Sequence, residues 1–499
     1  MDEPFDLVVI GGGINGAGTA RDAAGRGLRV LLAEKDDLAQ GTSSRSGKYI
    51  HGGLRYLEYY EFRLVREALI EREVILNTAC HLAWPIRLLL VHSPQQRPRW
   101  LIRLGLFLYD NLGGRKRIPG TRGVDLSKVP EGRAIKDAYR RAFAYYDVWV
   151  DDARLVVLNA VDAARRGAKV LTRTAVTHAR REDGLWRVGL NGPDGPQEVR
   201  ARALFNAAGP WVEQAIGQIA GVNSSKRIRL VKGSHLIIKR WWEGDHGFVL
   251  QASDKRIIFV NPYFDDLALV GTTDIPFEGQ PEDVAIDADE TRYLLDILNL
   301  YFRVDLSADD VLSAYSGVRP LFDDDAAKGA SAVTRDYTFE MDGGDDRAPL
   351  LSAFGGKLTT YRKLSEAALE HLAPYFPAMG AAWTDGVPLP GGDIPNAEFG
   401  AWFETFCARF PWLGADLARH YARCYGTDAI QMLDGASGMA DLGAHFGGLF
   451  YAREAEWLKR NEWAQTAQDM LERRTKHALF MTDAEQQAVG VWLDRMAAA

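Results

Sequence analysis

The chain has 499 residues, of which 47% are hydrophobic and 25% are charged, and its formal net charge is −7. These values are typical of a soluble globular protein of about two or three domains, and the acidic balance argues against nucleic acid as a partner. The three cysteines (Cys80, Cys407 and Cys424) form no CxxC pair, and no apolar run is long enough to span a bilayer. We therefore expect buried thiols in a cytoplasmic protein that has no secretory signal.

The N-terminal segment predicts a strand, a glycine turn, a helix and a second strand. Residues 5–10 are apolar except for Asp6, and Gly11, Gly13 and Gly16 form a GxGxxG motif. In this motif the first glycine makes a tight turn, the second lets the backbone approach a pyrophosphate, and the third lets the helix pack on the strand. Glu34 follows Gly16 by 18 residues, where its carboxylate can bind a ribose. Together these features predict a dinucleotide-binding site.

The middle of the chain predicts mainly strands, and several of them alternate apolar and polar residues, as in an antiparallel sheet with one open face. The expected strands are residues 170–177, 185–190, 203–207, 234–238, 257–260 and 267–270. Residues 384–397 are rich in Pro and Gly and predict a linker. A helical pattern follows to the end, with a capping box at Thr482–Glu485 before the last helix.

Two later segments favour FAD over NAD. Residues 205–211 (FNAAGPW) follow a predicted strand, and residues 355–361 (GGKLTTY) lie between an apolar strand and a helix. The N-terminus of that second helix can stabilise the negative charge that develops on the pyrimidine edge of a reduced flavin. A flavin therefore explains more of the sequence than a nicotinamide does.

Further motifs show a resemblance that extends over essentially the whole chain. They are residues 42–58 (TSSRSGKYIHGGLRYLE), 149–154 (WVDDAR), 233–235 (GSH), 271–274 (GTTD), 315–320 (YSGVRP), 334–337 (TRDY) and 355–363 (GGKLTTYRK). This set resembles the FAD-dependent, quinone-linked sn-glycerol-3-phosphate dehydrogenases. One departure is Arg45, since small residues are more usual between Ser44 and Gly47.

The resemblance implies a fold that is partly α/β and partly α+β. We expect a Rossmann-like FAD-binding domain, an interleaved substrate domain with an antiparallel sheet, and a C-terminal helical cap domain. The expected ranges are roughly 1–85, 150–225 and 330–390 for the FAD-binding domain, 86–149 and 226–329 for the substrate domain, and 391–499 for the cap.

The implied reaction is the oxidation of sn-glycerol 3-phosphate to dihydroxyacetone phosphate, with electrons passing through FAD to a membrane quinone. A phosphate dianion calls for several Arg or Lys donors, and the proton on the hydroxyl calls for a base such as histidine. His51 and His235 are alternative bases, and Arg319 could stabilise a developing alkoxide. The expected substrate-binding residues are Arg55, Tyr56, Thr273, Arg335 and Lys357.

The family pattern also implies a set of cofactor-binding residues, most of them in glycine-rich or hydroxyl-rich turns. They are Gly11, Gly13, Asn15, Gly16, Glu34, Thr42, Ser43, Ser44, Lys48, Gly53, Val176, Ala208, Gly209, Trp211, Gly356, Leu358, Thr359 and Thr360. No cluster of metal ligands with usable spacing is evident, so no metal is expected.

A basic and apolar segment raises the question of membrane contact. Residues 97–109 (RPRWLIRLGLFLY) are too short to span a bilayer, and residues 115–117 (RKR) follow. The segment either lies in the headgroup region of the cytoplasmic membrane or docks as a helix on the protein's own core. Because the quinone is in the bilayer, we expect a peripheral membrane protein, and a homodimer is compatible with the sequence.

Three other functions would leave different experimental signatures. A glycerol-3-phosphate oxidase would pass electrons to oxygen and release peroxide, and such enzymes often carry an inserted segment that this chain lacks. An NAD-linked Rossmann dehydrogenase would be colourless when purified. A non-catalytic nucleotide-binding or scaffold protein would show no flavin reduction.

Overall fold

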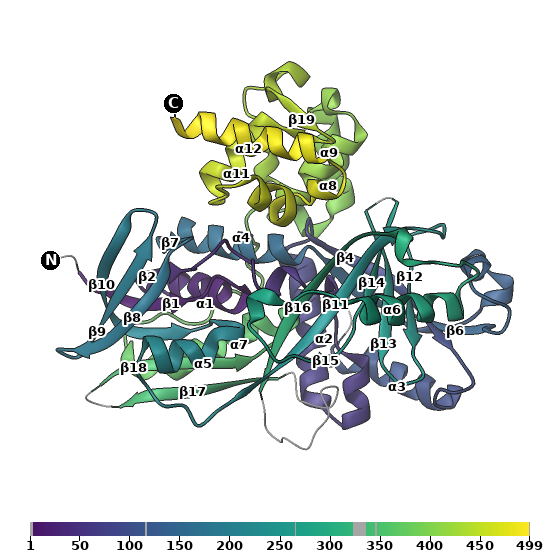
Figure 1. Cartoon of the computed structure of the whole chain (residues 1–499), viewed down its shortest axis with the longest axis horizontal. Coiled ribbons are helices and arrows are strands. Elements are labelled where there is room, and N and C mark those ends of the chain that lie inside the picture. The colour runs from purple at the N-terminus through teal and green to yellow at the C-terminus, as the bar shows by residue number, and fades with distance from the viewer. Residues whose placement is uncertain (1–2, 115–116, 265, 323–335, 345–346, 499) are drawn as a thin grey trace.

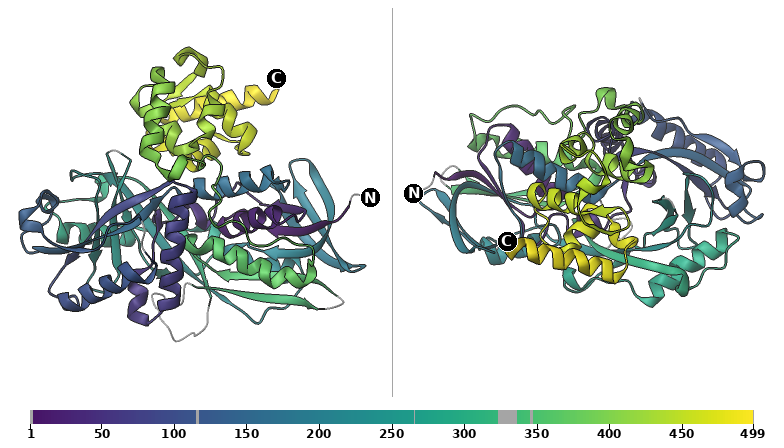
Figure 2. Two further views of the ribbon diagram at one scale, coloured as in Figure 1. Left: turned by 180° about the vertical axis from the view of Figure 1, so that it is seen from behind. Right: turned by 90° about the horizontal axis from the view of Figure 1, so that it is seen from above.

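The computed structural model describes residues 3–114, 117–264, 266–322, 336–344 and 347–498. Two sheets lie side by side in an elongated body, and a helical domain sits on one long face of that body (Figures 1 and 2). The predicted combination of α/β and α+β folds is confirmed.

The first sheet has a parallel centre with the nucleotide-binding topology that the N-terminal motif predicted. Strand β1 (Phe5–Ile10) pairs in parallel with β2 (Val30–Ala33) and with β10 (Gly195–Asn206). The full order is β17-β18-β10-β1-β2-β7, with β8 and β9 attached through β10. The other bounds are β7 Lys169–Leu171, β8 Ala175–Glu182, β9 Leu185–Gly192, β17 Tyr337–Gly344 and β18 Arg347–Gly355.

The predicted strand at residues 170–177 is two strands in the structure. The chain breaks between β7 and β8 because Arg173 adopts a positive φ of 51°. Its backbone N–H donates to Asp36 O (2.7 Å), and that of Thr174 donates to Glu34 O (2.7 Å). The break therefore carries the chain past the end of β2, beside the expected ribose-binding residue.

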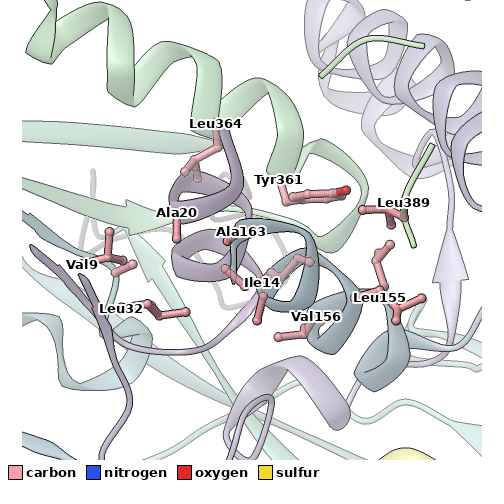
Figure 3. Close-up of a cluster of buried hydrophobic side chains, with 14 of the residues drawn as sticks. Val9, Ile14, Ala20, Leu32, Leu155, Val156, Ala163, Tyr361, Leu364 and Leu389 are labelled. Atoms are coloured by element: carbon pink, nitrogen blue, oxygen red, sulfur yellow. The ribbon is translucent and has the colours of Figure 1, made fainter. Parts of the chain in front are cut away.

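Three helices pack together over the first sheet, and alanines allow their close approach. Helix α1 (Ile14–Gly25) lies against α4 (Asp152–Arg165) and α7 (Tyr361–Leu372). Figure 3 shows Ile14 and Ala20 of α1, Val156 and Ala163 of α4, and Leu364 of α7 meeting in this core. Leu389 of the predicted linker joins the same core and is 2% exposed, so this part of the linker is packed onto the body.

The second sheet is larger and almost entirely antiparallel, and in the part of the chain that the structure describes only its strands β4 and β12 pair in parallel. Its order is β15-β11-β14-β13-β12-β4-β6-β3, with β16 on β11 and β5 on β6. Strand β3 lies in this sheet, whereas the expected ranges placed residues 1–85 with the FAD-binding domain. The bounds are β3 Tyr49–Ile50, β4 Ala83–His92, β5 Arg122–Asp125, β6 Arg141–Val150, β11 Ile228–Lys239, β12 Gly247–Gln251, β13 Ile257–Tyr263, β14 Leu267–Gly271, β15 Ile275–Pro276 and β16 Val311–Phe322.

The remaining helices of the body surround the two sheets. They are α2 Phe62–Thr78, α3 Arg99–Leu112, α5 Val212–Gln214 and α6 Ala288–Tyr301. Helix α6 packs on the second sheet through Leu294, Leu298 and Tyr301, and α3 packs against α2.

The C-terminal domain is mainly helical, as predicted, but it also contains a short hairpin. Its elements are α8 Phe399–Arg409, α9 Ala415–Tyr425, α10 Asp428–Met432, β19 His445–Gly447, β20 Phe450–Tyr451, α11 Ala452–Asn461 and α12 Asp483–Ala498. The capping box before α12 is confirmed, because Thr482 N–H donates to Glu485 Oε2 (2.7 Å) and Glu485 N–H donates to Thr482 Oγ1 (3.3 Å).

Buried ion pairs hold the C-terminal domain on the body. Arg154 of α4 pairs with Glu462, and the two side chains are 0% and 3% exposed. Arg474 pairs with Asp37 at 2.7 Å, and both side chains are fully buried. Lys476 pairs with Asp151 at the start of α4. The contact between the two parts is therefore charged at its centre.

Candidate active site

A cavity of ≈ 520 Å³ joins the glycine turn to the second sheet, within the range typical of ligand pockets. Twelve of the expected cofactor-binding residues line it: Gly11, Gly13, Asn15, Glu34, Thr42, Ser43, Val176, Ala208, Gly209, Trp211, Gly356 and Leu358. Arg319 and Lys357 line it as well. One continuous space therefore connects the nucleotide motif with Arg319, an expected catalytic residue, and Lys357, an expected substrate-binding residue.

The glycine turn requires glycine for two separate reasons. Gly11 has a φ of +106°, and a Cβ there would lie 2.7 Å from Ala207 O. A Cβ on Gly16 would lie 1.9 Å from Gly11 O, which explains why Gly16 is needed although it does not line the cavity. The turn brings the first N–H groups of α1 to the cavity, where they can bind phosphate.

Glu34 holds the turn together as well as facing the cavity. Its carboxylate accepts hydrogen bonds from the N–H of Gly12 (2.6 Å) and of Asp36 (2.8 Å). Burial raises the pKa of Glu34, and these two hydrogen bonds act in the opposite direction. Two carboxylate oxygens offer about four acceptor directions, so capacity remains for a ribose.

The segment from Thr42 to Lys48 divides into a cavity-lining part and a supporting part. Ser43 Oγ accepts from the N–H of Ile14 (3.0 Å), and Thr42 Oγ1 donates to Val318 O (2.6 Å). Lys48 is buried, and its ammonium donates to Asp152 (2.8 Å) and to Ser44 O (2.7 Å). Lys48 and Ser44 thus hold the loop from behind and do not line the cavity.

Three other expected cofactor-binding residues also lie behind the lining. Thr359 and Thr360 are buried at the start of α7. Gly53 has a φ of +75°, and a Cβ there would lie 2.2 Å from the ring of Tyr56. These residues shape the loop and the helix that border the cavity.

Arg319, which also lines the cavity, is held in place by the second sheet. Its guanidinium pairs with Asp274 and donates to Thr272 Oγ1 (3.2 Å). A Cβ on Gly233 would lie 2.6 Å from Arg319 Nη2, so the glycine of the GSH motif makes room for this side chain. Lys357 Nζ lies 3.9 Å from the ring centre of Tyr56.

The other expected substrate-binding residues are placed differently. Thr273 is fully buried, and its hydroxyl accepts from Ser234 N–H (3.0 Å) and donates to Glu290 (2.8 Å). Arg55 is half-buried in the 3-10 segment Leu54–Tyr59 and does not line the cavity. Arg335 lies outside the described residues. The roles of all these residues stay predictions.

Both candidate bases lie close to the lining without forming part of it. His235 is 2% exposed, and its ring stacks on Tyr315 at 4.9 Å. Burial, together with the charges of Arg319 and Lys48, lowers the pKa of His235 well below its usual range, so its imidazole is neutral. The backbone of His51 donates to Thr359 Oγ1 (3.2 Å). The geometry leaves both candidates open.

Several cavity-lining residues were not predicted from the sequence. Arg45 and Ser46 belong to a motif that was noticed, so their positions could have been found. Gln280 and Glu282 come from an irregular segment after β15, and no local pattern points to them. Glu282 accepts hydrogen bonds from Trp211 Nε1 (2.8 Å) and from Lys35 Nζ (2.7 Å), so it joins two parts of the cavity wall.

These features define a dinucleotide-binding oxidoreductase whose nucleotide site opens toward a second domain. The family model for FAD dependent oxidoreductase matches residues 6–362, and that for the C-terminal domain of alpha-glycerophosphate oxidase matches residues 382–499. The chain belongs to the FAD dependent oxidoreductase family, and FAD is its cofactor. The glycine turn, the N-terminus of α1 and Glu34 are the residues that fit the nucleotide half of FAD.

Relatives of known activity match the chain over nearly its full length. It is 57% identical to D-erythritol 1-phosphate dehydrogenase of Brucella abortus, over 99% of this chain and 98% of the relative. It is 51% identical to glycerol-3-phosphate dehydrogenase of Pseudomonas aeruginosa (99% and 96%) and 49% identical to aerobic glycerol-3-phosphate dehydrogenase of Escherichia coli (98% and 97%). The crystal structure of glycerol-3-phosphate dehydrogenase from Bacillus halodurans complexed with FAD superposes with a TM-score of 0.75 at 25% identity, covering 99% of this chain and 94% of that one.

Proposed function

We propose that this enzyme oxidises the secondary hydroxyl of sn-glycerol 3-phosphate to the ketone of dihydroxyacetone phosphate. The observation that carries the proposal is the single cavity that runs from the nucleotide motif to Arg319 and Lys357. These two cations in the lining of the same cavity suit a substrate that carries a phosphate dianion. Relatives at 49–51% identity are glycerol-3-phosphate dehydrogenases.

Bound FAD supplies the hydride acceptor, and the protein's own residues position the substrate and remove its proton. Arg319 is oriented by Asp274 and Thr272, so it can face the reacting oxygen without reorganising as negative charge develops there. Lys357 adds a second positive charge at the phosphate. His51 or His235 takes the hydroxyl proton.

The test is to add sn-glycerol 3-phosphate to the purified protein under anaerobic conditions and follow flavin absorbance. We expect bleaching with one equivalent of dihydroxyacetone phosphate formed, and much slower bleaching with unphosphorylated glycerol. Persistent flavin colour with glycerol 3-phosphate would refute the substrate assignment.

A second substrate is supported by one specific observation. The relative from Brucella abortus, at 57% identity, acts on D-erythritol 1-phosphate, which is one carbon longer and carries one more hydroxyl. The same anaerobic assay with both substrates separates them, because the true substrate should have the larger ratio of the flavin-reduction rate constant to the substrate dissociation constant. A preference for D-erythritol 1-phosphate would leave the reaction type unchanged and revise the substrate.

The electron acceptor in this proposal is a membrane quinone, and helix α3 would contact the bilayer. Among the described residues, every helix is too short or too polar to cross a membrane. Helix α3 buries Leu106 and Tyr109 on the body, while Trp100, Leu104 and Phe107 on the same helix are 69%, 48% and 56% exposed. Both sequence interpretations of this segment therefore have support, on different faces of one helix.

Charge and neighbouring residues suit a membrane surface rich in anionic lipid. Arg99 and Arg103 of α3 are exposed. Tyr60, which follows the adjacent 3-10 segment, and Phe62 of helix α2 are also exposed (81% and 41%). Apolar and aromatic side chains flanked by arginine are typical of interfacial helices.

Membrane binding is tested by sedimentation with vesicles of phosphatidylethanolamine and phosphatidylglycerol. Trp100→Ala/Phe107→Ala should weaken binding and slow turnover with a quinone, while anaerobic flavin reduction by substrate stays normal. Leu300→Ala/Leu312→Ala is the matched control, because these residues are exposed elsewhere on the body (52% and 63%). Equal losses in the two variants would reject α3 as the contact, and peroxide release without a quinone requirement would favour the oxidase.

A further inference from the structure

Three buried side chains of the C-terminal domain bring metal-ligating atoms together away from the active-site cavity. They are His420 on α9, Glu454 on α11 and His477 in the 3-10 segment His477–Leu479. One potential ligand atom from each lies within 4.8 Å of the others. His420 Nε2 is 2.7 Å from Glu454 Oε1 and 3.1 Å from His477 Nε2. The three side chains come from elements that are adjacent only in the folded domain.

With both imidazoles neutral and the carboxylate ionised, protons alone do not give each of these contacts a hydrogen bond of its own. His420 Nε2 can carry one hydrogen, yet it faces two other atoms that both present lone pairs, unless His477 Nε2 or the carboxylate is itself protonated. If His420 donates to Glu454, its contact with His477 Nε2 has no second hydrogen. If His477 donates to His420, then two lone pairs face each other at 2.7 Å across the contact with Glu454. One cation among the three atoms satisfies all of them at once.

The three side chains are buried, so water cannot supply the missing hydrogen bonds. The side chains of His420 and Glu454 are 8% and 0% exposed, and His477 is 4% exposed. Glu454 Oε2 is buried and, among the described residues, has no hydrogen-bond partner. Buried polar atoms are normally satisfied, so the second carboxylate oxygen is also available to a ligand.

The donor set favours a borderline transition metal over calcium or magnesium. Two imidazoles and one carboxylate suit Zn²⁺, Fe²⁺ or Mn²⁺. Tyr425 O–H donates to Glu454 Oε1 (2.6 Å), and Cys424 Sγ lies 3.6 Å from His420 Nδ1. Partners of this kind usually orient metal ligands from behind.

We propose that His420, Glu454 and His477 bind one divalent transition metal ion, with zinc preferred by ligand type. This ion would join helix α9, helix α11 and the segment His477–Leu479, which lie near the contacts that attach the C-terminal domain to the body. Residues within one helical turn of His420 and His477 contact the body of the protein. Arg154 donates to Cys424 O (2.8 Å), four residues after His420. Lys476, next to His477, pairs with Asp151.

The alternative is a cluster held by a proton. Burial would lower the pKa of His420, but the charge of Glu454 outweighs it, and with Cys424 it raises the pKa of His420 to about 10. An imidazolium–carboxylate pair would then occupy the site, with His477 neutral because burial and the charge of His420 lower its pKa. The two alternatives differ in metal content, which can be measured directly.

The test measures metal in the full-length flavoprotein. After chelator treatment and titration with Zn²⁺, inductively coupled plasma mass spectrometry should give one zinc per chain. Co²⁺ in place of zinc should give visible d–d absorption with a stoichiometry of one. His477→Ala and Glu454→Gln should abolish both signals, and Tyr425→Phe should weaken zinc binding about 10–100-fold.

His445→Ala is the matched control, because His445 is an exposed histidine of the same domain, and it should leave zinc content unchanged. Zinc should also raise the melting temperature of the wild type and not that of His477→Ala. Wild-type protein with no stoichiometric zinc and no Co²⁺ spectrum would overturn the proposal, even if the variants fail to fold. Zinc bound equally by wild type and His477→Ala would overturn it too, since the metal would then sit elsewhere.

Discussion

Replacing Glu34 by alanine should separate the cofactor site from the rest of the fold. In the structure this carboxylate already accepts the N–H groups of Gly12 and Asp36, and its position lets it accept both hydroxyls of the adenosine ribose. Hydrogen bonds to a charged group contribute about 1.5–3 kcal/mol each. Two such bonds amount to roughly 3–6 kcal/mol, which corresponds to FAD binding weakened by roughly 10²–10⁴-fold.

The assay has two parts. The ratio of flavin to protein absorbance reports occupancy after purification, and titration of apoprotein with FAD, followed by flavin fluorescence, gives the dissociation constant. Because Glu34→Ala also leaves two backbone N–H groups without an acceptor, the melting temperature of the apoprotein is measured alongside. Glu34→Gln keeps an acceptor oxygen and should show a smaller loss.

Glu198→Ala is the control, since Glu198 lies on β10 of the same sheet, pairs with Arg187 at the surface and is absent from the cavity lining. Its flavin content should equal that of the wild type. Full occupancy and an unchanged dissociation constant in Glu34→Ala would refute the assignment of Glu34 to the ribose, whatever the effect on melting.

Three further predictions concern the base, the cap contact and pH. If His51 or His235 removes the hydroxyl proton, its replacement by Ala should slow anaerobic flavin reduction roughly 10²–10⁴-fold but leave the binding of a substrate analogue unchanged. Normal reduction rates in both variants would show that neither histidine is the base. Arg154→Met should lower the free energy of unfolding by about 3 kcal/mol and clearly lower the melting temperature; this is the low end for a broken buried pair, because Arg474 still lies 3.7 Å from Glu462. The control Arg303→Met breaks an exposed pair and should lower the free energy of unfolding by less than about 1 kcal/mol. Similar effects at the two positions would contradict the prediction. Burial, with the charges of Arg154 and Arg423, lowers the pKa of His81 to about 3, so below pH 6.5 the unfolded chain binds a proton at His81 that the folded protein does not bind. The free energy of unfolding should therefore fall with acidification by up to about 1.4 kcal/mol per pH unit. In urea unfolding of His81→Leu at different pH values, the dependence of this free energy on pH should be shallower by that amount.

The sequence signals for the nucleotide half of the site are local. The glycine spacing and the position of Glu34 follow from the geometry of one strand, one turn and one helix, and the structure places them around one cavity. Arg319 and Lys357 were predicted from the family resemblance. Both line the same cavity because the two sheets lie side by side, and this arrangement cannot be derived from sequence spacing.

Other features were missed because tertiary contacts create them. Gln280 and Glu282 reach the cavity from an irregular segment, and the ion pair between Arg154 and Glu462 joins residues 308 positions apart. The break between β7 and β8 depends on one residue with positive φ. A single strand at residues 170–177 satisfied the local pattern equally well.

The ion pairs beneath the C-terminal domain have a consequence for how such proteins can change over evolution. Asp37 lies three residues after Glu34, and Asp151 precedes the residue that pairs with Lys48. Asp37 thus belongs to the loop that follows the expected ribose-binding residue, and Asp151 adjoins the residue that supports the cavity-lining loop from behind. A domain exchanged for an unrelated one would leave those carboxylates without counter-charges. We therefore expect the two parts to be inherited as one unit, with compensating changes on both sides of the contact appearing together.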